Sequence, residues 1–365
     1  MKLTASREDI LGPLQSVIGV VERRQTMPIL ANVLLAAREN RLNITGTDLE
    51  VELVASHAVT VQQPGDITVP GRKLLEIFRT LPEKCSVTLV AEGDRVSLRA
   101  GRSRFTLVSL PASEFPLVEE IGSQQHLTVA QSELRRLIEK THFSMAQQDV
   151  RYYLNGMLLE ADGKTLRAVA TDGHRLALCE TQLASPAKTT QQVIVPRKGV
   201  LELQRVLGGE GTVDIVIGTN HVRIQIGDIR FTSKLIDGRF PEYSRVVPAS
   251  PSKLVHADRE LLRHAFQRTA ILSNEKYRGV RLVVKPDLLT IQAHNPEQEE
   301  AEDQLEVSYK GEDMEIGFNV NYLMDALSAI ESAKIEVGLT DANSSCLIRD
   351  PENKDTKYVV MPMRL

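Results

Sequence analysis

The residue types best suited to catalysis gather in two short segments of the sequence. Asp172 and His174 stand two positions apart in TDGHRL, and a carboxylate beside an imidazole is a combination used in acid–base catalysis. A run of carboxylates occupies NPEQEEAE at residues 295–302, and clustered carboxylates can hold a divalent metal ion. One hypothesis is therefore a metal-dependent enzyme whose site combines these two segments.

The motifs that normally accompany such chemistry are missing from the sequence. It contains no GxxxxGK[ST] phosphate loop, no GxGxxG after a strand, no HExxH and no CxxC. The segment TDGHRL itself supplies neither a nucleophile nor a complete set of metal ligands. We therefore expect a non-catalytic protein with no catalytic residue, no bound metal and no cofactor.

Composition places the chain among soluble globular proteins. Its 365 residues are 42% hydrophobic and 25% charged, which is ordinary for such proteins. No apolar run approaches the roughly 20 residues of a membrane span, and the N-terminal MKLTASRED lacks the apolar stretch of a signal peptide. Cys85, Cys179 and Cys346 are isolated and odd in number, as expected for reduced core residues. We expect a cytoplasmic location.

The elements that would position these residues follow a repeat of about 125 residues. Thr47-Asp48 recurs as Thr171-Asp172, and the third copy has Asn295 in that slot. Two further landmarks recur at the same spacing, Val69-Pro70 as Val195-Pro196 and Phe115-Pro116 as Phe240-Pro241. This pattern predicts three domains of ordinary size, covering residues 1–125, 126–250 and 251–365.

Each repeat shows two helices and about eight strands. Apolar residues at helical spacing begin each repeat, and a second helical segment follows further on. The predicted first helices lie in residues 10–24, 131–146 and 258–272, and the second helices in 71–81, 197–207 and 320–330. Alternating segments such as 32–37 and 41–47 predict strands. The fold class is therefore α+β, with helices on one face of antiparallel sheet.

Basic residues recur on the predicted helices, although the chain carries a net charge of −4. Arg72 and Lys73 in the first repeat have counterparts in Arg197 and Lys198. A charged helix face is usually only solvated, but recurrence favours one basic side in an acidic protein. With a basic channel nearby, the clustered carboxylates would make the enzyme hypothesis a metal-dependent DNA-processing enzyme.

Domain size limits the assembly that three repeats can form. A domain of about 125 residues has a diameter near 35 Å. Three touching discs of that size leave a gap of only about 5 Å, whereas six in a ring leave a hole of about 35 Å. Duplex DNA is about 20 Å across. A ring around DNA therefore requires a dimer.

The two ends of the chain carry complementary surfaces that can close such a ring. A basic, partly apolar strand in the first repeat contains Arg102, Arg104 and Phe105. An acidic, partly apolar patch in the third contains Glu297, Glu299, Glu300 and Glu302 close behind Ile271 and Leu272. These surfaces are suited to pairing head to tail. The alternative is that both are solvated strands without a partner.

Long motifs along the whole chain resemble the bacterial DNA polymerase III β subunit, or sliding clamp, family. They include GTDLE, GRSRF, QDVRYYLNGMLLE, TDGHRLAL, FTSKLIDGRFPEY, AILSNEKYRGVRL, NPEQEEAE and YVVMPMRL. The resemblance implies a head-to-tail homodimeric ring of six similar domains, with helices lining the hole. It also implies a non-catalytic processivity factor that encloses double-stranded DNA without sequence preference and tethers the replicative polymerase.

The resemblance further implies a hydrophobic cleft between the second and third repeats. This cleft would receive short linear motifs of the polymerase, the clamp loader and repair proteins, and Asp172 and His174 would help to shape it. The implied cleft residues are Leu154, Thr171, Gly173, His174, Arg175, Leu176, Pro241, Arg245, Val246, Tyr322, Ser345, Val359, Val360, Met361, Pro362, Met363 and Arg364. Without the resemblance, VVMPMRL would be interpreted as a terminus that docks on the core.

Two more residue sets follow from the resemblance. The implied DNA-binding residues are Arg24, Arg72, Gln148, Tyr152 and Tyr153, where the alternative for the tyrosines is simple packing in a loop. The implied dimer-interface residues are Lys73, Arg95, Arg102, Arg104, Phe105, Ile271, Leu272, Glu297, Glu299, Glu300 and Glu302. The segment VVERRQ before and around Arg24 is more charged than in some relatives, which puts its DNA contact in doubt.

Overall fold

The computed structural model describes residues 1–22, 27–118 and 121–364. The chain divides into two compact units, each of which combines parts of two repeats. Unit 1 comprises Met1–Arg135 and Lys198–Leu235, and unit 2 comprises Arg136–Arg197 and Ile236–Leu365. The points of division fall in helices α3 (Gln131–Glu139) and α4 (Arg197–Val206).

Unit 1 contains two antiparallel sheets beside its helices. Its other elements are β1 (Lys2–Ser6), α1 (Arg7–Val17), η1 (Ile18–Val20), η2 (Pro28–Ala31), β2 (Asn32–Arg38), β3 (Arg41–Thr47), β4 (Val51–Ala58), β5 (Thr60–Gln63), β6 (Gly65–Pro70), α2 (Gly71–Thr80), β7 (Ser86–Glu92), β8 (Arg95–Ala100), β9 (Ser103–Val108), η3 (Ala112–Glu114), β10 (Gln125–Ala130), β15 (Thr212–Ile217), β16 (His221–Ile226) and β17 (Ile229–Lys234). The sheet orders are β5-β1-β7-β8-β9 and β10-β15-β16-β17-β4-β3-β2-β6. Helices α1 and α2 pack against each other.

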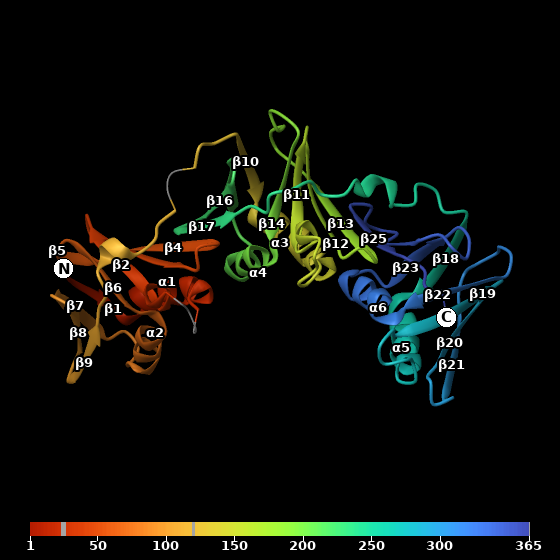
Figure 1. Cartoon of the computed structure of the whole chain (residues 1–365), viewed down its shortest axis with the longest axis horizontal. Coiled ribbons are helices and arrows are strands. Elements are labelled where there is room, and N and C mark those ends of the chain that lie inside the picture. The colour runs from red at the N-terminus through yellow and green to blue at the C-terminus, as the bar shows by residue number, and fades with distance from the viewer. Residues whose placement is uncertain (23–26, 119–120, 365) are drawn as a thin grey trace. The chain divides into compact units, whose positions relative to one another are not determined.

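Unit 2 also contains two antiparallel sheets beside its helices. Its elements are η4 (His142–Ser144), η5 (Tyr152–Leu154), β11 (Gly156–Asp162), β12 (Thr165–Thr171), β13 (Arg175–Gln182), β14 (Gln191–Pro196), η6 (Tyr243–Arg245), β18 (Lys253–Asp258), α5 (Arg259–Ala270), β19 (Gly279–Lys285), β20 (Leu288–His294), β21 (Glu300–Glu306), β22 (Met314–Asn319), α6 (Val320–Ala329), β23 (Lys334–Leu339), β24 (Cys346–Arg349) and β25 (Thr356–Val360). The sheet orders are β14-β11-β12-β13-β25-β24-β23-β18 and β21-β20-β19-β22. Helices α5 and α6 lie side by side (Figure 1).

The two eight-stranded sheets explain why the units cut across the repeats. In unit 1, the last strand of the second repeat, β17, pairs with β4 of the first repeat. In unit 2, the last strand of the third repeat, β25, pairs with β13 of the second. Neighbouring repeats are thus joined by continuous sheet, and the two seams use the same strand positions.

The predicted helices form at the expected positions, but each ends earlier than predicted, and α1 begins at Arg7, before residue 10. Helix α1 begins with a capping box in which Ser6 Oγ accepts from the Asp9 N–H, and Asp9 accepts from the Ser6 N–H. It ends at Val17 and continues as the 3-10 turn η1, so the predicted helix over 10–24 is too long. In α5, Asp258 accepts from the Leu261 N–H at 2.9 Å, as its capping position predicts.

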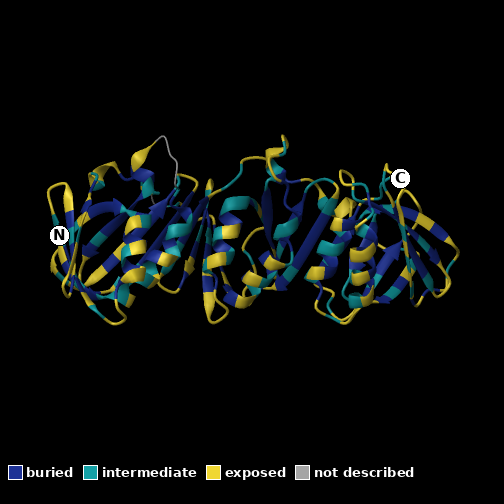
Figure 2. Cartoon of the chain, turned by 90° about the horizontal axis from the view of Figure 1, so that it is seen from below, coloured by how far each residue is buried: buried dark blue, intermediate teal, exposed yellow. Residues whose placement is uncertain are grey.

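Buried residues alternate with exposed ones along many of the helices and strands (Figure 2). Strand β10 shows a strict alternation of buried and exposed residues, which is the pattern of a sheet with one solvated face. Cys179 and Cys346 are buried free thiols, and Cys85 is partly buried, so all three are reduced, as predicted. In the part of the chain that the structure describes, no helix is long and apolar enough to cross a membrane.

Candidate functional site

A cleft of about 190 Å³ opens in unit 2 beside the turn between β12 and β13. Its floor is apolar, because Leu154, Leu176 and Val359 are each at most 4% exposed. Leu176 and Val359 are direct partners in the ladder between β13 and β25, so the seam between the second and third repeats forms part of the floor. The full lining is Arg151, Tyr153, Leu154, Thr171, Gly173, Arg175, Leu176, Pro241, Glu242, Tyr243, Val246, Val359 and Met361.

One wall of the cleft is the turn that follows Thr171. Thr171 Oγ1 donates to the Arg175 carbonyl at 2.6 Å, and Asp172 Oδ1 accepts from the N–H groups of His174 and Arg175. Gly173 adopts φ +89, a left-handed conformation that glycine reaches without strain. The turn is therefore held by its own side chains, which is why the Thr-Asp pair recurs in the sequence.

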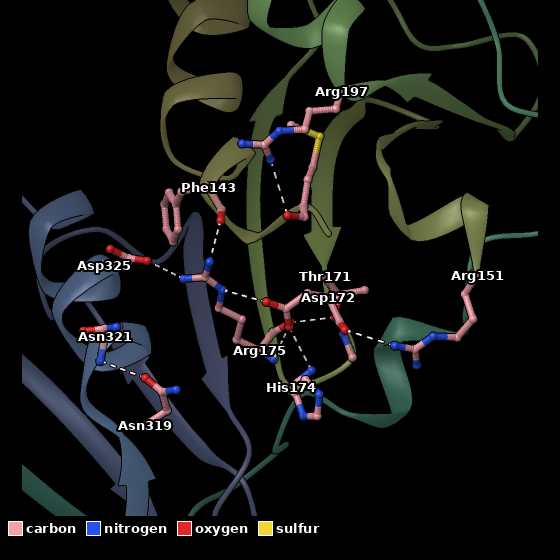
Figure 3. A network of polar contacts seen from close by, with 12 residues as sticks. Phe143, Arg151, Thr171, Asp172, His174, Arg175, Arg197, Asn319, Asn321 and Asp325 are labelled. Atoms are coloured by element: carbon pink, nitrogen blue, oxygen red, sulfur yellow. Dashed lines mark hydrogen bonds and ion pairs between the residues drawn. The ribbon is translucent and has the colours of Figure 1, made fainter. Parts of the chain in front are cut away.

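Arg175 connects this turn to the third repeat (Figure 3). Its guanidinium donates to Asp172 at 3.1 Å, to Asp325 on α6 at 2.5 Å and to the Phe143 carbonyl at 2.7 Å. The same group lies over the rings of Tyr322 and Phe143, 4.5 and 5.7 Å from their centroids. Asp172 is thus engaged in a structural ion pair rather than free for acid–base chemistry.

The opposite wall is the segment around η6. Phe240 is 5% exposed and packs with Leu158, Leu176 and Val359 in one cluster under the cleft, and the ring of Tyr243 packs against that cluster. The Tyr243 hydroxyl donates to Glu160 Oε1 at 2.6 Å. The Phe-Pro landmark of the repeat therefore anchors a wall of the cleft.

The C-terminal segment closes one end of the cleft. The Met361 N–H donates to the His174 carbonyl at 2.9 Å, and the Met363 N–H donates to the Gly317 carbonyl at 2.8 Å. Met361 is 40% exposed, whereas Val360 is 1% exposed and lies in the core of the third repeat. A flexible methionine at the rim suits a site that accepts varied apolar groups.

Nine of the residues that the sequence pointed to line the cleft together. They are Leu154, Thr171, Gly173, Arg175, Leu176, Pro241, Val246, Val359 and Met361. The other predicted residues are not part of the lining. Tyr322 lies against Arg175, and Val360 lies in the core of the third repeat. The rest are His174, Arg245, Ser345, Pro362, Met363 and Arg364. Arg151, Glu242 and Tyr243 line the cleft although the sequence did not point to them, and Tyr153, expected to bind DNA, lines it too.

Comparison with known proteins decides the family. Models described as the N-terminal, central and C-terminal domains of the DNA polymerase III beta subunit match residues 1–119, 128–242 and 244–364. The chain belongs to the DNA polymerase III beta subunit family. A relative from Pseudomonas aeruginosa named beta sliding clamp is 56% identical, with 100% of both chains covered.

Solved structures of beta subunits agree with this family. A crystal structure of the DNA polymerase III subunit beta from Pseudomonas aeruginosa matches with a TM-score of 0.98 at 55% identity, covering 100% of both chains. A sliding clamp from the same organism, solved bound to griselimycin, matches with a TM-score of 0.97 at 56% identity and the same coverage. The chain thus has three repeated clamp domains, and its described residues form six α-helices beside antiparallel sheets.

Beta subunits are non-catalytic processivity factors of the polymerase holoenzyme. The hypothesis of a metal-dependent DNA-processing enzyme is therefore not supported. Among residues 1–22, 27–118 and 121–364, no three His, Cys, Asp or Glu side chains are grouped to hold a metal ion.

The residues that the family resemblance assigned to DNA lie in different settings. Arg24 lies outside the described residues. Arg72 donates to the Val21 carbonyl at 2.9 Å and is partly buried. Gln148 is exposed with φ 54, and Tyr152 is 58% exposed. The rings of Tyr152 and Tyr153 meet edge to face with centroids 5.9 Å apart.

Four of the residues assigned to the dimer interface lie on end strands of two sheets. Strand β9, with Arg104 and Phe105, is an end strand of its sheet in unit 1. Strand β21, with Glu300 and Glu302, is an end strand in unit 2. The other members are mostly exposed, including Ile271 at 75%: Lys73, Arg95, Arg102, Leu272 (partly buried), Glu297 and Glu299.

Proposed function

We propose that two copies of this chain close head to tail into a ring around duplex DNA and tether the replicative polymerase and other replication and repair proteins through the cleft of unit 2. In this proposal the clamp domains are residues 1–125, 126–250 and 251–365, and the protein acts in the cytoplasm. The observation that carries the ring is the pair of open edges, β9 and β21.

These two edges are the counterparts of strands that the chain already pairs. Strand β9 is the last strand of its repeat, as β17 and β25 are of theirs, and β21 stands where β4 and β13 stand. At the first internal seam β17 pairs with β4, and at the second β25 pairs with β13, both antiparallel. Joining β9 of one copy to β21 of another repeats the same contact, which satisfies both exposed edges and closes a ring through two identical interfaces.

The register of the internal seams predicts which residues meet in the third. Phe231 faces Leu53 at one seam, and Tyr358 faces Ala177 at the other. Counting from the hairpins places Phe105 at the aromatic position and Ala301 opposite it. The next position then sets Arg104 against Glu302, so charge complementarity reinforces the strand pairing.

The cleft is suited to a short extended peptide. Its floor of Leu154, Leu176 and Val359 is apolar and buried, so one or two apolar anchors of a peptide can fill it. The Arg151 and Arg175 side chains line the cleft beside this floor, where they can meet polar groups of the same peptide. We infer that the cleft residues implied by the family resemblance bind partner peptides, with Arg151, Tyr153, Glu242 and Tyr243 added to them.

DNA contact in this proposal is weak and independent of sequence. A chain with net charge −4 does not bind DNA tightly at rest, and contacts from arginine to phosphate carry no sequence information. Tyr152 beside Gln148 is placed to stack on an unpaired base. Retention on DNA then depends on topology, which allows sliding.

Retention on circular and linear DNA tests the ring. We expect the protein, once loaded, to stay on a nicked circular plasmid in 0.5 M NaCl and to be lost after the plasmid is linearised, because the salt screens phosphate contacts while leaving topological linkage intact. The measurement is the fraction of labelled protein that co-elutes with DNA in gel filtration. Equal retention on both forms would contradict the encircling ring.

A further inference from the structure

A row of polar side chains crosses four strands of the sheet beneath the cleft. Glu160, Arg167 and Glu180 are successive ladder partners on β11, β12 and β13, and Gln192 on β14 faces Glu160. Arg167 donates to Glu160 Oε1 and to Glu180 Oε2, both at 2.7 Å. Gln192 donates to Glu160 Oε2. Both carboxylate oxygens of Glu160 are thus occupied, and its side chain is only 7% exposed.

The neighbouring row, two residues along each strand, is apolar. Residues two apart on a strand share a face, so this row lies on the same face as the polar one. Its members pack in the cluster under the cleft and are Leu158, Val169, Leu178 and Ile194. The face therefore changes from apolar to charged within one step along all four strands.

Tyr243 spans the boundary between these rows. Its ring packs against the apolar cluster and lines the cleft, while its hydroxyl donates to Glu160 Oε1 at 2.6 Å. Burial, together with this bond, raises the pKa of Tyr243 to about 12. The hydroxyl is therefore protonated, and remains a donor, throughout the neutral range.

Few other hydrogen bonds hold the segment Pro241–Val246 in place. The Ile236 N–H donates to the Ile194 carbonyl at 2.9 Å, and Phe240 is buried, but both attachments come before the segment begins. Within the segment, hydrogen bonds join Arg245 to Glu242 and Val246 to Tyr243, and neither reaches the sheet. The hydrogen bond from the Tyr243 hydroxyl to Glu160 therefore joins this wall to the sheet.

The charged row is specific to the repeat that carries this wall. The same ladder positions hold Ala36, Asn43 and Ser56 in the first repeat. In the third repeat they hold Val283, Thr290 and Gln304. Counted from the Phe-Pro landmark, Val118 stands where Tyr243 does. The fold therefore forms without the row, although burying these charges costs desolvation energy.

We propose that Glu160 is a positioning residue of the cleft, which holds the Tyr243 hydroxyl and thereby keeps Pro241–Val246 as a pre-formed wall for an incoming peptide. This inference rests on the proposed peptide-binding function. Releasing the hydroxyl lets the wall occupy other positions, and only a fraction of the molecules is then ready to bind. The apparent affinity falls by that fraction, through slower association with little change in dissociation. Loss of a direct contact to the peptide would instead speed dissociation.

Binding kinetics of full-length variants test the proposal. The probe is the tightest binder among labelled 15-residue peptides tiled along the replicative polymerase of the same organism, with griselimycin as a second probe. We expect Tyr243→Phe and Glu160→Leu each to weaken binding about 3- to 10-fold, with a lower association rate and an unchanged dissociation rate. Glu160→Gln keeps an acceptor for the hydroxyl and is expected to bind like wild type.

The matched control is Tyr309→Phe. It removes a hydroxyl that donates to the Glu312 carbonyl at 2.7 Å in the third repeat, away from the lining of the cleft. We expect wild-type binding from it. Tyr243→Phe combined with Glu160→Leu should bind no more weakly than the weaker single variant, because both remove one shared bond. Hydrogen exchange of the Arg245 and Val246 amides should quicken in Tyr243→Phe without any probe present.

Three results would overturn the proposal. Wild-type rates and exchange in both Tyr243→Phe and Glu160→Leu would remove the positioning role while leaving peptide binding intact. Faster dissociation with unchanged association would make the Tyr243 hydroxyl a direct peptide contact. Failure of wild-type protein to bind any probe would overturn peptide binding itself, and with it the purpose assigned to this bond.

Discussion

Arg175 illustrates how much of the cleft depends on single side chains. Its guanidinium satisfies two carboxylates and a carbonyl while lying against Tyr322 and Phe143. A planar group with five donors suits such a position better than a lysine ammonium. One arginine thus joins the β12–β13 turn to helix α6, a connection that its assignment to the cleft by resemblance did not reveal.

The Asp149–Arg151 pair provides a test of electrostatics at the same scale. Hydrogen bonds from the side chain and N–H of Arg151 lower the pKa of Asp149 from 3.8 to about 2. Because the folded pKa is depressed, the stabilisation from this carboxylate is present above about pH 4 and is lost as the pH falls toward 2. Carbon-13 NMR titration should give a midpoint near 2 for Asp149, and Arg151→Gln should raise it. A midpoint near 3.8 in the wild-type protein would mean that the pair does not form in solution.

Among the elements, the repeated turn and the inner strand β25 matter most for the cleft. The turn at Thr47-Asp48 makes the same four hydrogen bonds as the turn at Thr171-Asp172. Its third residue, Leu49, likewise has a positive φ of 79. The Thr-Asp pair therefore encodes a turn, not a catalytic site. In contrast, β25 contributes Val359 to the cleft because the strand lies between β13 and β24 in the sheet.

Truncation after Val360 separates the strand from the segment that follows it. Residues 361–365 lie beyond β25, so the sheet remains complete while the Met361 wall and its bond to the His174 carbonyl are removed. We expect peptide affinity to fall at least about tenfold, as for loss of a buried interface anchor, and the mass in solution to stay at twice the 40.5 kDa chain mass. Tyr309→Phe, which removes a hydroxyl away from the lining of the cleft, is the control. A monomeric truncation would show instead that the terminus is structural.

At the scale of the whole molecule, one kind of strand pairing accounts for the organisation. This pairing joins the first repeat to the second and the second to the third. The corresponding strand β9 of the first repeat and β21 of the third remain end strands of their sheets. A dimer that pairs β9 of each copy with β21 of the other is closed, and the pairing protects these two strands from unwanted partners.

Charge reversal at the predicted third seam tests that closure. Arg104→Glu should weaken the dimer by about 10- to 100-fold, because it places two carboxylates opposite each other, and Glu302→Arg should do the same with two cations. Both changes in one chain should restore the dimer. Sedimentation equilibrium measures the effect, and Arg38→Glu, which breaks an exposed pair with Asp66 on another sheet, should leave the mass unchanged. A double variant as weak as either single one would mean that these residues do not meet.

The structure shows where inference from sequence succeeds and where it stops. The helices around Leu14, Leu74 and Leu262 were predictable because periodic burial is a local property. The cleft residues near the Thr-Asp and Phe-Pro landmarks were recognised through long motifs. Tyr243 and Glu160 end two of these motifs, but their hydrogen bond could not be predicted, because they are 83 residues apart and the bond depends on strand register.

The sequence by itself determined the three repeats, their two helices each and the turns, because these follow from side-chain spacing within a few residues. Only the tertiary structure decided which strand edges pair, and therefore which side chains line the cleft together. Backbone hydrogen bonds are the same for every residue, so the choice of partner strand depends on how distant segments pack. That packing brings Leu176 against Val359, closes the first two seams and leaves β9 and β21 open.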